Sequence, residues 1–100
     1  MQTVLLVYKL QKGVDLEDYL EWSKKKDQPG IKTIDYILDH APHYVVGPEK
    51  IWHIFEIFKV EKLEDWEKFT KSDTSKRLTK EWLKLVDKDS VKIVYGNQIK

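Results

Sequence analysis

Cysteine is absent from this chain of 100 residues, which excludes disulfide frameworks, thiol catalysis and cysteine metal sites. Arginine occurs once, at Arg77, although 18 basic residues nearly balance 17 acidic ones. Nucleic-acid surfaces depend on arginine and on a basic stripe, so we expect no nucleic-acid partner. No apolar run approaches the roughly 20 residues of a membrane span, and the first apolar run lacks signal-peptide features. We therefore expect no membrane partner and a cytoplasmic location.

The composition is that of a soluble globular protein, with 41% hydrophobic and 35% charged residues. A chain of this length forms one domain with a modest core, so we assign residues 1–100 to a single domain. The sequence contains no glycine-rich phosphate loop, nucleophile elbow or zinc-protease motif. Function must therefore be argued from scattered polar residues on apolar elements.

Hydrophobic periodicity predicts four strands and two helical regions. Residues 3–10 form the first strand, and a helix capped by Asp15 is expected to end at Pro29 and Gly30. The alternating residues 31–40 predict a second strand, followed by a loop over 41–50. Residues 61–89 read as a helix broken near 71–74, with Ser72 or Asp73 as a cap. The last strand is expected at 90–96.

The third predicted strand, "IWHIFEIFKV" at 51–60, is apolar on both faces. The order β-α-β-β-α-β places both helical regions on one face of a four-stranded antiparallel sheet, which is the α+β ferredoxin-like plait. Nothing in the chain is left to cover the other face. A second copy packed face to face is the economical cover, so we expect a homodimer that forms a dimeric α+β barrel.

Several stretches resemble the dimeric α+β barrel superfamily, most closely its REDY-like group and next its EthD-like group. The stretches that carry the resemblance are "GVDLEDYLEW", "IKTIDYILD", "IFEIFKVEKLEDWEKF" and "KEWLKLVDKDSVKIVYG". At the position of the group's Arg-Glu-Asp-Tyr signature this chain has Lys25, Lys26, Asp27 and Gln28, so only the acid is kept. The resemblance implies binding of a small hydrophobic or aromatic molecule. It also implies isomerase, cyclase or monooxygenase chemistry without a metal or other cofactor.

Two acids are candidate catalytic residues. Asp27 falls on the apolar helix face of Leu16, Tyr19, Leu20 and Ser23, where burial would raise its pKa into the range of a general base. Alternatively, the helix ends before Asp27, or the carboxylate pairs with a lysine. Glu56 lies mid-strand between apolar neighbours and needs partners if it is ionised.

For Glu56, we expect a position in the barrel lumen, where Lys9 or Lys92 would pair with it. That pair would be structural or would take part in ligand binding, and the sequence leaves both open.

The histidines are the remaining polar candidates. His40, His43 and His53 could together ligate a metal, but no helical i, i+4 spacing supports this, so we expect no metal site. His40 and His53 are better placed as polar groups at a pocket mouth, with His53 a further catalytic candidate. For ligand binding we select five residues: Tyr8, Tyr36, His40, Trp52 and Glu56.

These observations leave several functions open. The leading prediction is a small-molecule-binding homodimer, with or without enzymatic activity, and it requires a cavity lined by Asp27, Glu56 or a histidine. The alternative is a non-enzymatic regulatory or interaction dimer with no ligand cavity. An RNA-binding plait ranks last, because the third strand has no glycine and carries a central glutamate.

Overall fold

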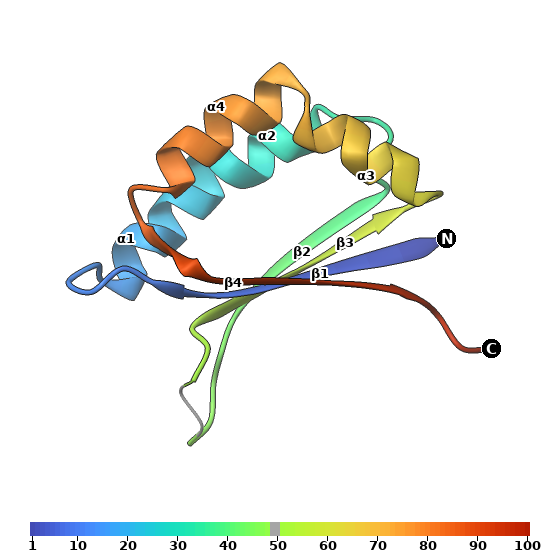
Figure 1. Ribbon diagram of the computed structural model, residues 1–100. Coiled ribbons are helices and arrows are strands. Elements are labelled where there is room, and N and C mark those ends of the chain that lie inside the picture. The colour runs from blue at the N-terminus through green and yellow to red at the C-terminus, as the bar shows by residue number, and fades with distance from the viewer. Residues whose placement is uncertain (49–50) are drawn as a thin grey trace.

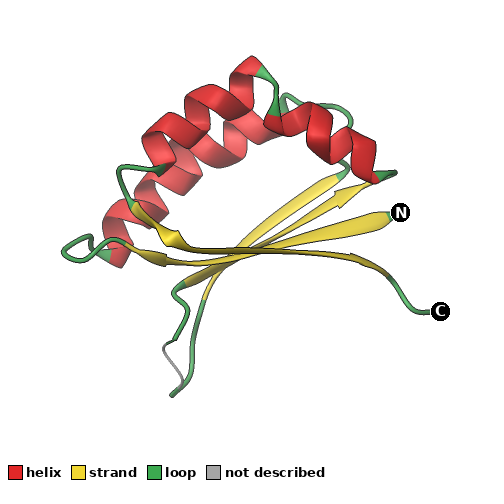
Figure 2. Cartoon of the chain, viewed as in Figure 1, coloured by secondary structure: helices red, strands yellow, loops and turns green. Residues whose placement is uncertain are grey.

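The protein is an antiparallel sheet with every described helix on one face, as Figures 1 and 2 show for a computed structural model that describes residues 1–48 and 51–100. The strands follow the order β2-β3-β1-β4 and are β1 (Gln2–Leu10), β2 (Asp39–Tyr44), β3 (Ile54–Val60) and β4 (Val86–Asn97). This topology confirms the predicted ferredoxin-like plait. No described helix is long and apolar enough to cross a bilayer.

The N-terminal helical region runs further than the sequence predicted. It consists of α1 (Leu16–Trp22), the π-helical segment η1 (Ser23–Asp27) and α2 (Gln28–Lys32). Pro29 stands in the first turn of α2, where its missing N–H costs little, so the proline does not end the helix. Gly30 does not end it either: a Cβ there would lie 3.0 Å from Leu78 Cδ1, so glycine allows close packing against a second helix.

The second strand was predicted wrongly at 31–40. Residues 33–38 instead form turns, with Ile34 and Ile37 each donating a backbone hydrogen bond three residues back. Strand β2 begins at Asp39 and includes residues of the predicted loop. It lies at the edge of the sheet, where a strand can accommodate a proline such as Pro42. Alternation over 31–40 therefore reflects packing of a turn rather than a strand. The predicted loop's residues 49–50 lie outside the described part of the chain.

Strand β3 is shorter than predicted and begins after Trp52 and His53. Its alternate residues Ile54, Glu56, Phe58 and Val60 are buried and face the helices. The prediction that Glu56 faces a barrel lumen beside Lys9 or Lys92 is wrong. In the antiparallel register Glu56 lies opposite Leu6, whereas Lys92 lies opposite Val7 on the other face.

The second helical region is broken where the sequence predicted. It comprises α3 (Leu63–Thr70) and α4 (Asp73–Trp82), and Ser72 caps α4 by accepting a hydrogen bond from the Ser75 N–H at 3.1 Å. Strand β4 starts earlier than expected, with a register irregularity opposite Val7–Lys9. The break directs α3 and α4 over different parts of the sheet (Figure 1).

The core between sheet and helices consists of two groups of side chains. One group is wholly apolar and aromatic, around Val4, Phe58, Trp66, Phe69 and Leu78. The other, at the α1 end, includes two buried tyrosines with Leu10, Ile54 and Val86: Tyr8 and Tyr19. The polar residues of the candidate site lie between these two groups.

Candidate functional site

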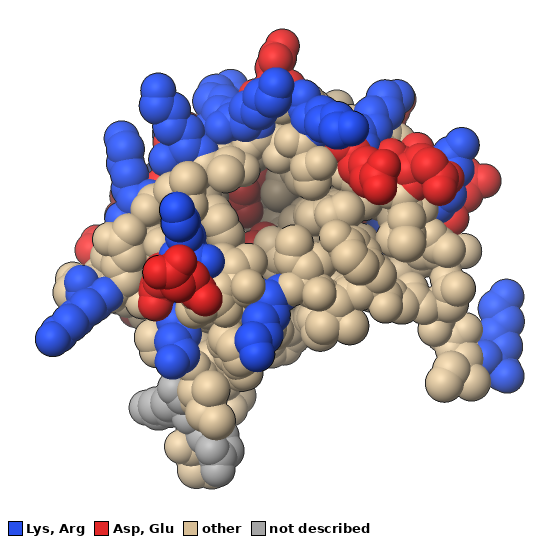
Figure 3. Space-filling view, in the orientation of Figure 1, with Lys and Arg blue, Asp and Glu red and all other residues tan. Residues whose placement is uncertain are grey.

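A cavity of about 350 Å³ lies between the sheet and the helices. The space-filling view shows a hollow beneath the helices, with acidic atoms inside it (Figure 3). The two acidic residues of its wall are Asp27 and Glu56. The rest of the wall is mainly apolar and aromatic: Leu6, Ile31, Phe58, Trp66, Phe69, Thr70, Ser75, Leu78, Thr79, Trp82, Val91 and Ile93. This is the usual composition of a small-molecule site.

Glu56 is held at the cavity floor by two hydrogen bonds. The Tyr8 hydroxyl donates to Oε2 at 2.6 Å, and His40 Nε2 lies 2.7 Å from Oε1. Because an ionised carboxylate only accepts hydrogen bonds, the His40 proton then sits on Nε2. Glu56 is 3% exposed, so these partners supply the solvation that water would otherwise give.

The two buried tyrosines extend this network towards α1. The Tyr8 and Tyr19 hydroxyls are hydrogen-bonded to one another, and the Tyr8 proton is directed to Glu56, so Tyr19 donates to Tyr8. Burial, followed by the negative charge of Glu56, raises the pKa of both phenols well above its usual range. Both tyrosines therefore stay neutral and act as donors that fix the orientation of Glu56.

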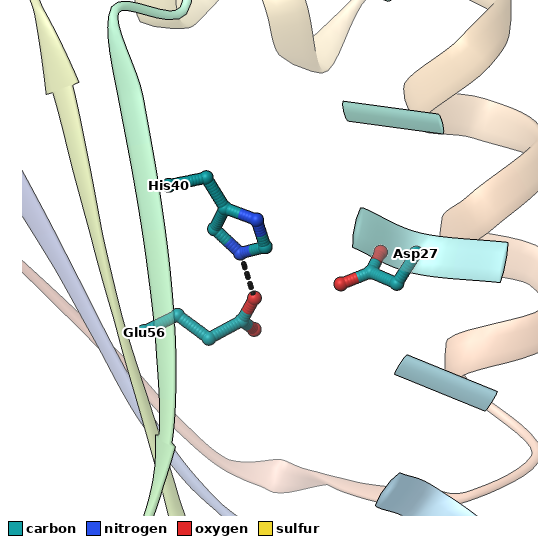
Figure 4. A group of neighbouring side chains, drawn as sticks. All are labelled: Asp27, His40 and Glu56. Atoms are coloured by element: carbon teal, nitrogen blue, oxygen red, sulfur yellow. Dashed lines mark hydrogen bonds and ion pairs between the residues drawn. The ribbon is translucent and has the colours of Figure 1, made fainter. Parts of the chain in front are cut away.

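Asp27 faces this network from across the cavity (Figure 4). It comes from η1, whose wider turn is marked by the hydrogen bond from the Gln28 N–H to the Ser23 carbonyl. Its side chain is only 6% exposed, yet it has no hydrogen-bond or ion-pair partner among residues 1–48 and 51–100. Its oxygens are not fully buried and line the cavity, so a bound molecule can reach the carboxyl and supply the hydrogen bond that the described residues do not.

The environment of Asp27 favours its protonated form. Burial and, after it, the negative charges of Glu56 and Glu81 together raise the pKa of the Asp27 carboxyl from 3.8 to about 8. At neutral pH the carboxyl holds a proton that it can give up and recover near physiological pH. A carboxyl with this property is suited to general acid–base catalysis.

Asp27, His40 and Glu56 are also the described residues that could hold a metal ion. One ligand atom from each lies within 4.8 Å of the others. However, His40 Nε2 and Glu56 Oε1 are engaged with each other at 2.7 Å, so an ion bound by both would have to replace this hydrogen bond. The three predicted imidazoles do not meet: His43 stacks on Phe55 and His53 lies elsewhere.

The structure brings three of the predicted ligand residues into one network: Tyr8, His40 and Glu56. It places His53 and Trp52 beside a different depression, about 380 Å³ in volume, near Leu10 and Val45. There, His53 Nδ1 accepts the Leu10 N–H at 2.9 Å, which gives His53 a structural task. The Lys92 ammonium lies 5.6 Å from the Trp52 ring.

Tyr36 is also outside the cavity, because the predicted strand that would have aimed it inward does not form. Its ring contacts the Lys68 ammonium, 4.4 Å from the ring centre. Tyr19, Glu81 and Trp82 were not selected from the sequence as site residues. A signal for Tyr19 was present, since it shares the predicted helix face of Asp27, but nothing in the sequence shows that Glu81 approaches Asp27.

Comparison with protein families identifies one match over nearly the whole chain. The family model for the REDY-like protein HapK matches residues 2–99. No curated protein matches the sequence.

Solved structures with the same fold have low sequence identity to this chain. HapK from Hahella chejuensis is 14% identical, with a TM-score of 0.85, over 99% of this chain and 93% of that one. An EthD-family protein from Bacillus halodurans C-125 is 16% identical, with a TM-score of 0.78, over 99% of both chains. A dimeric ferredoxin-like protein of unknown function from Bacteroides fragilis NCTC 9343 is 16% identical, with a TM-score of 0.78, over 97% and 95%.

Proposed function

Since the chain belongs to the family of the REDY-like protein HapK, we propose that it is a homodimer whose cavity binds a small hydrophobic or aromatic molecule and catalyses proton transfer on it. The observation that carries this proposal is the carboxyl of Asp27, a residue only 6% exposed, which makes no hydrogen bond within the described part of the chain and lines the same apolar cavity as Glu56. The alternative, an interaction module without a cavity, gives Asp27 no role.

The hydrogen bonds of each polar group indicate which role it can take in proton transfer. Asp27 makes no hydrogen bond within the described residues that a proton transfer would break, so its proton can move to or from a bound molecule. Glu56 accepts from Tyr8 and from His40, so it serves as a fixed negative charge that orients His40. His40 can donate or accept a proton through its second ring nitrogen, Nδ1. One ligand atom from each of Asp27, His40 and Glu56 lies within 4.8 Å of the others, so these acid–base groups would act together from one side of a bound molecule.

Support for the homodimer comes from the outer face of the sheet, which alternates with the buried inner face along each strand. Its apolar side chains are covered by no described element: Leu5, Val7, Phe55, Ile57 and Val94. All described helices lie on the opposite face (Figure 1). An uncovered apolar sheet face is typical of an interface, and a similar fold from Bacteroides fragilis is described as dimeric.

Proton transfer can be tested with 2-indanone, a compact apolar ketone with acidic α-protons. In D₂O, the wild-type protein is expected to accelerate exchange of these protons, followed by NMR, by roughly 10²-fold or more over buffer. Asp27→Asn removes the ionisable group at constant shape and should lose most of this acceleration. Asp18→Asn removes an exposed carboxylate from the same helical region and should leave the rate unchanged. Equal rates for wild type and Asp27→Asn contradict the proposed acid–base role.

A further inference from the structure

The charged groups of the cavity are all of one sign. Its wall includes the carboxyls of Asp27 and Glu56 but no lysine or arginine. The basic side chains visible in Figure 3 lie on the outer surface around the hollow. Glu81 adds a further nearby negative charge, since it contributes to the raised pKa of Asp27. An anionic ligand would be repelled by this arrangement, and a neutral one would offer no positive charge to stabilise the ionised form of Asp27.

The apolar part of the wall is rich in aromatic rings. Phe58, Trp66 and Phe69 pack together with ring centres 4.8 to 6.1 Å apart. Trp82 closes another side of the cavity and meets the Tyr8 ring edge-on, with the centres 5.1 Å apart. Aromatic faces attract cations, most strongly where water is excluded. Rings and carboxyls together therefore favour a ligand that is both apolar and positively charged.

We propose that the cavity binds a compact hydrophobic amine in its ammonium form, with the ammonium at Asp27 and the apolar body among the aromatic rings. This inference rests on the proposed function in one respect, namely that the cavity is the ligand site. It adds the chemical class of the ligand. The ammonium would supply the hydrogen-bond donor and counter-charge that Asp27 lacks in the described part of the chain.

Such a ligand would also change the state of Asp27. A positive charge within hydrogen-bond distance stabilises the carboxylate and opposes the effects of burial, Glu56 and Glu81. Asp27 would then release its proton as the amine binds, so that the base form appears only when the ligand is in place. The other titratable groups around it are Tyr8, Tyr19 and His40, all hydrogen-bonded within the network.

Three probes with a shared phenyl body test the ligand class: phenethylamine, 2-phenylethanol and phenylacetate. Each is titrated at pH 7 in the presence of EDTA, and binding is followed by the indole N–H NMR signals of Trp66 and Trp82. Phenethylamine should bind at least about tenfold more tightly than 2-phenylethanol, with phenylacetate the weakest. Asp27→Asn should remove this preference, whereas Asp18→Asn should keep it.

The outcomes separate this inference from the proposed function. If 2-phenylethanol binds as tightly as phenethylamine, the amine preference is wrong, but the cavity remains a ligand site. The inference is also overturned if Asp27→Asn keeps the preference, since overall protein charge would then explain it. If none of the three probes shifts the indole signals, the cavity does not admit such molecules, and the proposed function fails together with the inference.

Discussion

The two faces of the sheet differ in what they do with polar groups, although they alternate along the same strands. On β3 the inner residues Ile54, Glu56 and Phe58 are buried under the helices, while the outer residues Phe55 and Ile57 are only half-buried. The inner face includes a carboxylate with two dedicated hydrogen-bond partners. The outer face has apolar side chains without a cover. We therefore proposed ligand chemistry for the inner face and association for the outer face.

The largest expected effect comes from placing a charge on the outer face. Ile57 lies opposite Leu5 on one neighbouring strand and Ala41 on the other, near the middle of this face. We expect Ile57→Asp to convert the dimer to a 12.0 kDa monomer at micromolar concentration, as measured by light scattering. Ile99→Asp adds the same charge at a residue that is 95% exposed and should leave the dimer intact. A wild-type monomer would refute the proposed association.

The next largest effect is expected when the negative charge of Glu56 is removed from the inner face. Glu56→Gln keeps the shape but turns a charge-assisted acceptor of two hydrogen bonds into an amide that has to present its NH₂ group to Tyr8 or His40. We expect the free energy of unfolding to fall by roughly 3 kcal/mol, measured by denaturant titration. The same variant should lower the pKa of Asp27, because the Glu56 charge contributes to its elevation. An unchanged Asp27 titration by NMR would show that the two carboxyls are uncoupled.

Asp27→Asn should act in the opposite direction on stability. The folded-state pKa of Asp27 is raised from 3.8 to about 8, so the folded protein binds more protons than the unfolded chain between these values. Wild-type stability therefore contains a penalty that is absent below pH 4 and grows until about pH 8. The variant should be more stable than wild type by a margin that is near zero at pH 4 and grows to a few kcal/mol at pH 8, with about 5 kcal/mol as the upper bound set by the shift. A pH-independent difference would contradict the raised pKa.

The fold could be predicted from the sequence because hydrophobic periodicity and the residues that begin or end helices and strands are local signals. The strand–helix order, the break before α4 and the Ser72 cap all follow from such signals. The errors at Pro29, Gly30 and 31–40 arose where tertiary contacts override them, as in the packing of Gly30 against Leu78. Alternation identified Glu56 as a residue that needs partners, but it could not decide which face the helices would cover.

The positions of the candidate site residues, like the fold, were predicted correctly where a local pattern specified them and were missed where tertiary contacts determined them. Asp27 was identified because its helix face is apolar over several turns, and that face is buried as expected. Tyr8 and His40 reach Glu56 from the two neighbouring strands, each diagonally across the pairing register, and no local pattern in the sequence specifies this register. His53 and Trp52 were misplaced because β3 begins at Ile54, three residues later than the predicted strand.

The smallest effect is expected at His53, a residue that we assign neither to proton transfer nor to association. His53 accepts the Leu10 N–H through Nδ1 and lies apart from the cavity of Asp27. His53→Ala should therefore lower the free energy of unfolding by about 1 kcal/mol, the typical contribution of one hydrogen bond. Because His53 does not line the cavity of Asp27 and Glu56, exchange of 2-indanone protons should match wild type. A loss of exchange activity without a loss of stability would instead place His53 in the catalytic machinery and the cavity assignment would have to change.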